Sequence, residues 1–468
     1  MTWLVIADDL SGAADCAIGF AAAGARTVVT LDANAGRDPG RDPGRDQGGH
    51  TCANTGGERD GNTGGNEDSD KGSHTGRDSD RDSDRDIGQA QVIAADVDSR
   101  RLAPAAAAAR NLDAWRRLDG AQRRLYKKID STLRGNWAEE TAALLPHAGL
   151  AIVAPAFPAT GRTTRDGCMF INGEPLGDSD IWRLEGLRGR ADMVALLAAR
   201  QVRAVAVSLA TVRAGADTLR HAIEALAQDG TQAVVCDAET EADIATLAQA
   251  TSSLSTRAFW VGSGGLARVL AAVAPGTGPG ATGAATGPAT STTGAGAVPP
   301  RRPGPVLALV GSLSGVSGRQ AALLRQETGI DAIEIAPQTL RDGGGHAAWN
   351  AAQQDIARRL DHDCDLLLTI GRDDAFDPAE GPLLSTALAA LVLPWFHRVG
   401  GLIATGGETA RAMLAAADIA TLVLQHEVEA GVPLSHTLEI PPRRVATKAG
   451  AFGSDAALWR AWQAMKAP

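Results

Sequence analysis

Short apolar runs alternate with alanine-rich amphipathic stretches along most of the chain, and this alternation constrains the fold more than any other feature. Before residue 275 the predicted elements are strand 3–7, helix 11–24, strand 27–31, strand 91–96, helix 104–117, strand 125–129, helix 136–146, strand 150–154, strand 203–208, helix 214–228, strand 232–236, helix 240–253, strand 257–261 and helix 264–273. After residue 304, strands are predicted near 306–310, 331–335, 366–370, 400–404 and 421–426, with helices between them. Because strands that alternate with helices build parallel βαβ units, we predict an α/β fold of two domains, each a mostly parallel sheet flanked by helices, with a ligand cleft between them.

Two low-complexity tracts interrupt the alternation. Residues 33–89 are rich in Gly, Asp, Arg and Ser and offer almost nothing to bury, so we predict a disordered insertion. Residues 275–304 are rich in Gly, Pro and Thr and predict a linker, whose typical span of roughly 30 Å would let two domains open and close. The predicted domains are therefore 1–274 and 305–468.

Composition excludes several classes of protein. No basic stripe interleaved with aromatic residues is present, so we do not expect a nucleic-acid partner. No uninterrupted apolar run reaches the ~20 residues that span a bilayer, and the first residues do not resemble a signal peptide. The five cysteines are far apart and form no C-x-x-C pair, which is typical of reduced thiols in a cytoplasm. We expect a cytoplasmic protein, and leave open whether it forms a homo-oligomer.

Paired carboxylates follow the first predicted strand. In parallel α/β sheets ligands bind beyond the carboxyl ends of the strands, and Asp8 and Asp9 lie at such an end, before Ser11 and Gly12. One of the two acids can be explained as a helix N-cap. Capping does not explain both, so we predict a role in substrate binding for Asp8 and in catalysis for Asp9.

The densest polar cluster of the N-terminal half follows the strand at 125–129. It contains Lys128, Asp130, Ser131, Arg134 and Gly135, in a chain where lysine is otherwise scarce. The alternative interpretation is a solvated turn in which Ser131 caps a helix. We favour an anion site, because arginine can bind a carboxylate with two hydrogen bonds and an aspartate can accept a hydroxyl proton.

A long loop rich in Pro, Gly, Thr and Arg is predicted over 154–167. Loops of this length are usually binding loops or disordered. Thr160 and Arg162 are therefore predicted to contact a polar substrate.

Three glycine-rich turns follow strands in the C-terminal half. Glycines let the backbone approach a phosphate, and the N–H groups at a helix start bind anions. We predict a nucleotide pocket there, and the residues chosen from the three turns are Ser312, Ser314, Gly406, Gly407, Glu408, Thr409, Lys448, Gly450 and Gly453.

These segments together resemble the four-carbon acid sugar kinase family. The resemblance rests on ADDLSGA, KKIDSTLRGN, PAFPATGRTT and GSGGLA before the linker and on GSLS, ATGGETA and KAGAFG after it. It implies ATP-dependent phosphorylation of D-threonate, D-erythronate or 3-oxo-tetronate, with an acid-binding N-terminal domain and a nucleotide-binding C-terminal domain. It also implies that Ser312 or Ser314, Gly406 to Thr409, and Gly450 contact ATP. Ser11 departs from the family, which more often has threonine there.

The expected mechanism is domain closure that aligns an acid hydroxyl with the γ-phosphate of ATP, whose phosphates Mg²⁺ bridges. Arg134 would bind the substrate carboxylate, Lys128 the transferred group, and either Asp130 or Asp9 would be the base; no residue is assigned to the metal. Two alternatives remain. The segment Gly262 to Ala267 fits the G-x-G-x-x-A pattern of an NAD-dependent hydroxy-acid dehydrogenase, although no acid follows about 20 residues later. A non-catalytic sensor of an acid or nucleotide is the other.

Overall fold

The computed structural model describes residues 2–31, 87–118, 120–184, 189–273, 302–373, 377–450 and 452–467. Most of the predicted insertion at 33–89 and of the linker at 275–304 lies outside these residues. Residues 87–89 are described and form a turn of helix in which Ile87 is buried, so the predicted disorder does not extend to them.

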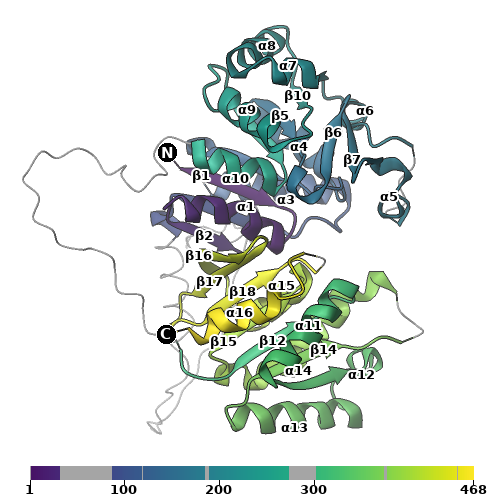
Figure 1. Cartoon of the computed structure of the whole chain (residues 1–468), viewed down its shortest axis with the longest axis vertical. Helices are drawn as coiled ribbons and strands as arrows, with labels where there is room; N and C mark the ends of the chain where they lie inside the picture. The colour runs from purple at the N-terminus through teal and green to yellow at the C-terminus, as the bar shows by residue number, and fades with distance from the viewer. Residues whose placement is uncertain are drawn as a thin grey trace, which may run out of the picture.

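Both halves of the chain are α/β (Figure 1). The N-terminal half contains β1 (Trp3–Ala7), α1 (Leu10–Ala22), β2 (Thr27–Thr30), β3 (Val92–Asp96), α3 (Pro104–Arg117), β4 (Arg124–Lys128), α4 (Trp137–Ala148), β5 (Leu150–Ala154), β6 (Arg162–Arg165), β7 (Cys168–Ile171), β8 (Glu174–Pro175), α5 (Asp180–Leu184), α6 (Met193–Ala198), β9 (Ala204–Val207), α7 (Leu209–Arg213), α8 (Ala216–Gln228), β10 (Ala233–Cys236), α9 (Glu241–Ser252), β11 (Ala258–Gly262) and α10 (Gly264–Val273). The C-terminal half contains β12 (Val306–Val310), α11 (Gly315–Thr328), β13 (Asp331–Ile335), α12 (Pro337–Asp342), α13 (Ala347–Asp361), β14 (Leu366–Ile370), α14 (Gly381–Val392), β15 (Gly401–Thr405), α15 (Gly407–Ala416), β16 (Thr421–Glu429), β17 (Val432–Thr437), β18 (Arg444–Lys448) and α16 (Ala457–Lys466). The predicted α/β class is confirmed.

Strands of the sheet interior are continuous apolar runs because helices cover both of their faces. Every residue of β1, β3 and β5 is buried. The helices begin where the sequence supplies a start signal: Pro104 occupies the first turn of α3, and Thr240 and Asp243 form a capping box at α9. No helix among the described residues is long and apolar enough to cross a membrane.

The sheets of the two halves are continuous with each other. Among the described residues, a 15-stranded sheet runs in the order β13-β14-β12-β15-β18-β17-β16-β2-β3-β1-β4-β11-β5-β10-β9. Figure 1 shows it passing from the purple and teal upper half into the yellow and green lower half. The two halves were predicted to have a mostly parallel sheet each. The structure adds an antiparallel region at the join, where β16 pairs with both β17 and β2.

Main-chain hydrogen bonds therefore link the halves directly. Residues 421–423 of β16 pair with residues 28–30 of β2, and the Leu31 N–H donates to the Ala420 carbonyl at 2.8 Å. Helix α1 packs against β16 as well as against α10. Any relative movement of the halves must bend this shared sheet. The length of the linker therefore does not by itself determine how far the halves can move apart.

The predicted loop at 154–167 is partly ordered as strand. Residues 162–165 are β6, which pairs with β7 and through it with β8 in a separate three-stranded sheet. The prediction of a continuous loop was wrong there, because Arg162 to Arg165 are hydrogen-bonded across a hairpin that turns at Asp166 and Gly167, both at positive φ.

Candidate active site between the two halves

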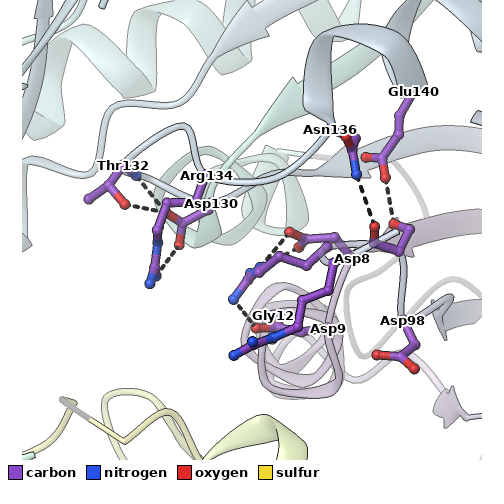
Figure 2. A network of polar contacts seen from close by, with 12 residues as sticks. Asp8, Asp9, Gly12, Asp98, Asp130, Thr132, Arg134, Asn136 and Glu140 are labelled. Atoms are coloured by element: carbon purple, nitrogen blue, oxygen red, sulfur yellow. Dashed lines mark hydrogen bonds and ion pairs between the residues drawn. The ribbon is translucent and has the colours of Figure 1, made fainter. Parts of the chain in front are cut away.

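The predicted carboxylates and lysine of the N-terminal half meet at one edge of the sheet. β1 lies between β3 and β4, with Ala7 level with both Asp96 and Lys128. The residues that follow these three strands therefore project from adjacent carboxyl ends, as Figure 2 shows for Asp8, Asp9 and Asp130. The structure brings these segments together at the carboxyl ends of β1, β3 and β4.

Arg100 connects the two adjacent acids. Its Nε donates to Asp8 Oδ2 at 2.8 Å and its Nη2 to Asp8 Oδ1 at 3.1 Å, while Nη1 lies 2.6 Å from Asp9 Oδ2. Burial alone would raise the pKa of Asp8, but Arg100 and Lys128 hold it below its usual value. Arg100 was not among the predicted site residues. Its position directly after a strand, in DSRR, is the signal that could have found it.

Asp9 also begins the helix that follows it. Its Oδ1 accepts a hydrogen bond of 2.6 Å from the Gly12 N–H, which makes it the N-cap of α1. A methyl group on Gly12 would lie 2.7 Å from Asp9 Oδ1 and 2.9 Å from Lys128 Nζ. A larger residue at position 12 would therefore displace the Asp9 carboxylate and the Lys128 ammonium from the start of the helix.

Lys128 is a buried cation surrounded by acids. Burial alone would lower its pKa, but Asp8 and other neighbouring anionic groups raise it above its usual value. Lys128 therefore keeps its charge at neutral pH and can attract an anion.

Asp130 and Arg134 pair with each other. Arg134 Nε donates to Asp130 Oδ2 and Nη2 to Oδ1, both at 2.9 Å, and the Thr132 N–H donates to Oδ2 at 3.0 Å (Figure 2). Burial alone would raise the pKa of Asp130, but the Arg134 hydrogen bonds lower it well below its usual range. A carboxylate stabilised in this way is a poor proton acceptor. Asp130 is therefore a poor candidate for the base, and its carboxylate lies opposite the guanidinium predicted to bind a substrate carboxylate.

A cavity of about 90 Å³ lies among these residues. Its lining comes from both halves: Asp9, Ser11, Gly12, Asp15, Arg100, Lys128, Asp130, Ser131, Arg134, Phe157, Ser263 and Gly264 on one side, and Gly431, Ala449 and Phe452 on the other. Four of the predicted substrate residues are not in this lining. Asp8 lies behind Arg100, Gly135 packs near Asp8, and Thr160 and Arg162 belong to the neighbouring β6 region.

The three glycine-rich turns of the C-terminal half also come together. The Gly450 carbonyl accepts hydrogen bonds from Ser314 Oγ at 3.0 Å, Ser317 Oγ at 2.7 Å and Lys448 Nζ at 3.1 Å. The Gly406 N–H donates to the Lys448 carbonyl at 2.8 Å. The turns after β12, β15 and β18 thus form one cluster. Ser317 belongs to it and was not predicted.

Other predicted nucleotide residues lie around this cluster. Ser312 Oγ donates to Ser314 Oγ at 3.2 Å. Thr409 is buried, and its Oγ1 lies 3.2 Å from Ser385 Oγ. Gly453 lies further along the last turn, at φ +84°. Burial lowers the pKa of Lys448 to about 8.

Two helix N-termini face each other between the halves. Helix α15 begins at Gly407, and a methyl group there would lie 3.1 Å from Ser11 Oγ and 3.6 Å from the Ser11 nitrogen in the first turn of α1. The first N–H groups of a helix lack intrahelical partners and carry partial positive charge. Ser11 Oγ is itself buried and has no hydrogen-bond partner among the residues that the structure describes. The starts of α1 and α15 are thus packed against each other where the two halves meet.

Ion pairs join the two halves around this junction. Arg411 Nη1 lies 2.5 Å from Asp96 Oδ2, and Arg101 Nη2 lies 2.8 Å from Oε1 of Glu408, a predicted nucleotide residue. Burial raises the pKa of Asp96 to about 7, although Arg411 opposes the shift. The start of α15 is therefore linked by ion pairs to the carboxyl edge of the N-terminal sheet.

A larger cavity, of about 320 Å³, lies at the opposite edge of the N-terminal sheet, beside the start of β4 and β11. None of the predicted residues lines it. Because ligands of parallel sheets bind at the carboxyl ends of the strands, the smaller cavity is the candidate active site.

The comparisons with known proteins cover the whole chain. Residues 3–49 and 62–270 match the model of a sugar-binding N-terminal domain, and residues 307–458 match that of a nucleotide-binding C-terminal domain. A D-threonate kinase of Cupriavidus necator is 59% identical over 99% of this chain and 98% of its own length. A 3-oxo-tetronate kinase of Methylobacterium radiotolerans is 31% identical over 78% of this chain and 87% of its own length. A solved Haemophilus influenzae structure from a family of unknown function has a TM-score of 0.66 at 19% identity, covering 99% of this chain and 100% of that one, and shows the same fold.

The fold and the matched domains define a two-domain α/β sugar kinase. Within that class the chain belongs to the four-carbon acid sugar kinase family. The predicted resemblance and the predicted kinase are confirmed.

Proposed function

We propose that this chain transfers the γ-phosphoryl group of ATP to a hydroxyl group of D-threonate. The observation that carries the proposal is the cavity lined from both halves, with Lys128 and Arg134 on the N-terminal side and the last glycine-rich turn, through Ala449 and Phe452, on the other. D-threonate is preferred to other four-carbon acids because it is the substrate named for the 59% identical relative.

We assign the acid to the N-terminal domain, 1–274, and ATP to the C-terminal domain, 305–468. Arg100, Lys128 and Arg134 supply positive charge to the acid cavity, and the carboxylate of the acid fits there. The turns that meet at the Gly450 carbonyl, together with the start of α15, would hold the phosphates. The G-x-G-x-x-A segment has packing roles instead: a methyl group on Gly265 would lie 2.8 Å from the Ala156 carbonyl oxygen.

In the transfer, the substrate hydroxyl oxygen forms a bond to the γ-phosphorus while the bond from that phosphorus to the bridging oxygen of ADP breaks. The hydroxyl proton passes to the Asp9 carboxylate, which lines the cavity. Lys128 and the N-termini of α1 and α15 neutralise charge on the transferred group. Positioning and charge neutralisation supply most of the catalysis.

Mg²⁺ would neutralise the ATP phosphates. Among the described residues no group of three or more acidic, histidine or cysteine side chains is placed to hold a metal ion. Mg²⁺ in kinases is commonly bound by one or two carboxylates and the substrate phosphates, and the carboxylates in the described lining that would bind it are Asp9, Asp15 and Asp130.

The decisive experiment is a substrate screen. Release of ADP is measured with D-threonate, D-erythronate and 3-oxo-tetronate, each with ATP and Mg²⁺, and NAD(H) turnover is followed in parallel. We expect ADP release with D-threonate at the highest kcat/KM. Absence of ADP with every acid would refute the kinase proposal, and a higher kcat/KM with another of the acids would refute the choice of D-threonate.

We further place the enzyme in the cytoplasm and expect it to form a homo-oligomer. The four cysteines among the described residues are unpaired, which suits a reducing compartment. Light scattering of the purified protein at several concentrations tests the oligomer; a mass of one chain at all of them would contradict it.

The pKa of Lys448 predicts a pH dependence for ATP. With a pKa of about 8, its ammonium loses its proton as the pH rises through 8. The neutral amine attracts phosphate less strongly, so kcat/KM for ATP should fall by about 10- to 100-fold between pH 7 and pH 9.5, the effect of one charge-assisted hydrogen bond. The Lys448→Met variant should show the low value throughout this range. A flat profile in the unmodified enzyme, or the same fall in Lys448→Met, would contradict the assignment.

A further inference from the structure

One large apolar side chain from the nucleotide-binding half reaches the acid cavity. Phe452 lies in the turn between β18 and α16, two residues after Gly450. The C-terminal half contributes only Gly431 and Ala449 besides Phe452 to the described lining. The ring is therefore the main wall on that side, facing the charged residues of the N-terminal half.

The wall is held in place by several contacts. The Phe452 carbonyl accepts a hydrogen bond of 3.0 Å from Gln320 Nε2, and its N–H donates to the Ala449 carbonyl at 3.1 Å. Arg162 of β6 stacks over the ring, with its Cζ 5.9 Å from the ring centroid. A methyl group on Gly431 would approach the ring to 3.4 Å. The backbone of Phe452 is thus held within the C-terminal half, and its ring lies against Arg162 of the N-terminal half.

The space in front of this wall is small. The cavity of about 90 Å³ is far below the roughly 300 Å³ at which pockets for drug-sized ligands begin. Phe157 forms a second apolar surface, packed so closely that a methyl group on Gly265 would lie 3.1 Å from its ring. A longer sugar acid would have to press another carbon and hydroxyl against an aromatic face, where the hydroxyl finds no partner.

We propose that Phe452, fixed beneath Arg162, sets the chain length of the acid that the enzyme accepts. The ring closes the cavity behind a four-carbon acid and rejects five-carbon aldonic acids. This inference rests on the proposed function, because it concerns the acid that receives the phosphoryl group. It also means that the nucleotide-binding half, through the turn that carries Gly450, determines the specificity for the acid.

The test is the ratio of kcat/KM for five-carbon aldonic acids to kcat/KM for D-threonate. It is measured with ribonate, arabinonate, xylonate and lyxonate in the unmodified enzyme, Phe452→Leu and Phe452→Ala. One methylene in an apolar pocket changes kcat/KM by about 10- to 200-fold, so the ratio for the best five-carbon acid should rise at least about tenfold in Phe452→Ala, with Phe452→Leu between. A ratio within twofold of the unmodified enzyme in both variants would overturn the proposal.

Phe170→Ala is the matched control. Phe170 of β7 lies beneath an arginine in the same way, with Arg165 Cζ 5.5 Å from its ring centroid, but does not line the cavity. In Phe170→Ala the ratio of kcat/KM for the five-carbon acids to kcat/KM for D-threonate should stay unchanged. A rise equal to that in Phe452→Ala would overturn the proposal. If the Phe452 variants lose turnover, calorimetry compares instead the Kd of each five-carbon acid with that of D-threonate, and this ratio should shift in the same direction.

The two ideas can fail separately. An unmodified enzyme that releases no ADP with any four-carbon acid refutes the proposed function. An unmodified enzyme that is active with D-threonate, together with Phe452 variants whose ratio is unchanged, refutes only the role of Phe452.

Discussion

Replacing Asp9 by asparagine should slow phosphoryl transfer by about 10²- to 10⁴-fold, the usual contribution of a general base, while the fold stays nearly unchanged. Asparagine is as good an N-cap as aspartate, so the hydrogen bond from the Gly12 N–H at the start of α1 is retained. What the variant loses is the basic carboxylate and its ion pair with Arg100. The rate is measured in a single turnover with labelled ATP, and circular dichroism confirms the fold.

Asp130→Asn is the informative comparison. Because Arg134 holds the pKa of Asp130 far below its usual range, Asp130 does not readily accept a proton. Its replacement by asparagine should weaken binding of the acid, because the ion pair no longer holds the Arg134 guanidinium in position. This loss of binding should be larger than the loss in the rate of the transfer step. A single-turnover rate within threefold of normal in Asp9→Asn, or a greater loss in Asp130→Asn, would show that Asp9 is not the base.

Replacing Lys127 by methionine should lower the free energy of unfolding by about 3–5 kcal/mol, the cost of leaving one charge of a buried pair uncompensated. Lys127 Nζ lies 2.9 Å from Glu140 Oε2, with side chains 0% and 1% exposed. This pair joins the end of β4 to α4 directly beside Lys128 and Asp130. Urea denaturation followed by tryptophan fluorescence measures the loss.

Adding Glu140→Gln to Lys127→Met should restore much of the stability. The second change removes the buried charge and keeps an acceptor for Ser99 Oγ, which donates to Glu140. Glu139→Gln is the control on the same helix, because its ion pair with Arg200 is partly exposed and should contribute only about 0.2–1 kcal/mol. A double variant as unstable as Lys127→Met alone would show that the loss does not come from the unpaired carboxylate.

The sequence predicted which segments form the site better than it predicted their pairings. Asp9, Lys128 and Asp130 could be found because each lies at or just after the end of a strand, and the carboxyl ends of parallel strands meet at one edge. Arg100 was missed because its pairing with Asp8 depends on β3 lying beside β1, which no local pattern encodes. The Asp130–Arg134 ion pair, between residues four apart, changed the role expected for Asp130, although both residues were named.

The arrangement of the two halves was the least predictable feature. Alternation of strands and helices indicates βαβ units within each half, but it does not indicate that β16 pairs with β2 across almost the whole length of the chain. The contact between Ser11 and Gly407 follows from this pairing. Neither residue has a sequence signal that points to the other, since helix starts with serine or glycine occur throughout the chain.

The shared sheet has a consequence for how the chain can be cut. The β2–β16 ladder, the packing of α1 on β16 and the ion pairs of Arg411, Arg101 and Arg268 hold the halves together without any residue of 274–301. An unbroken peptide chain between residues 274 and 301 is then not needed for the two halves to associate. Residues 1–274 and 302–468, translated as two polypeptides in the same cell, should associate and reconstitute the kinase by fragment complementation.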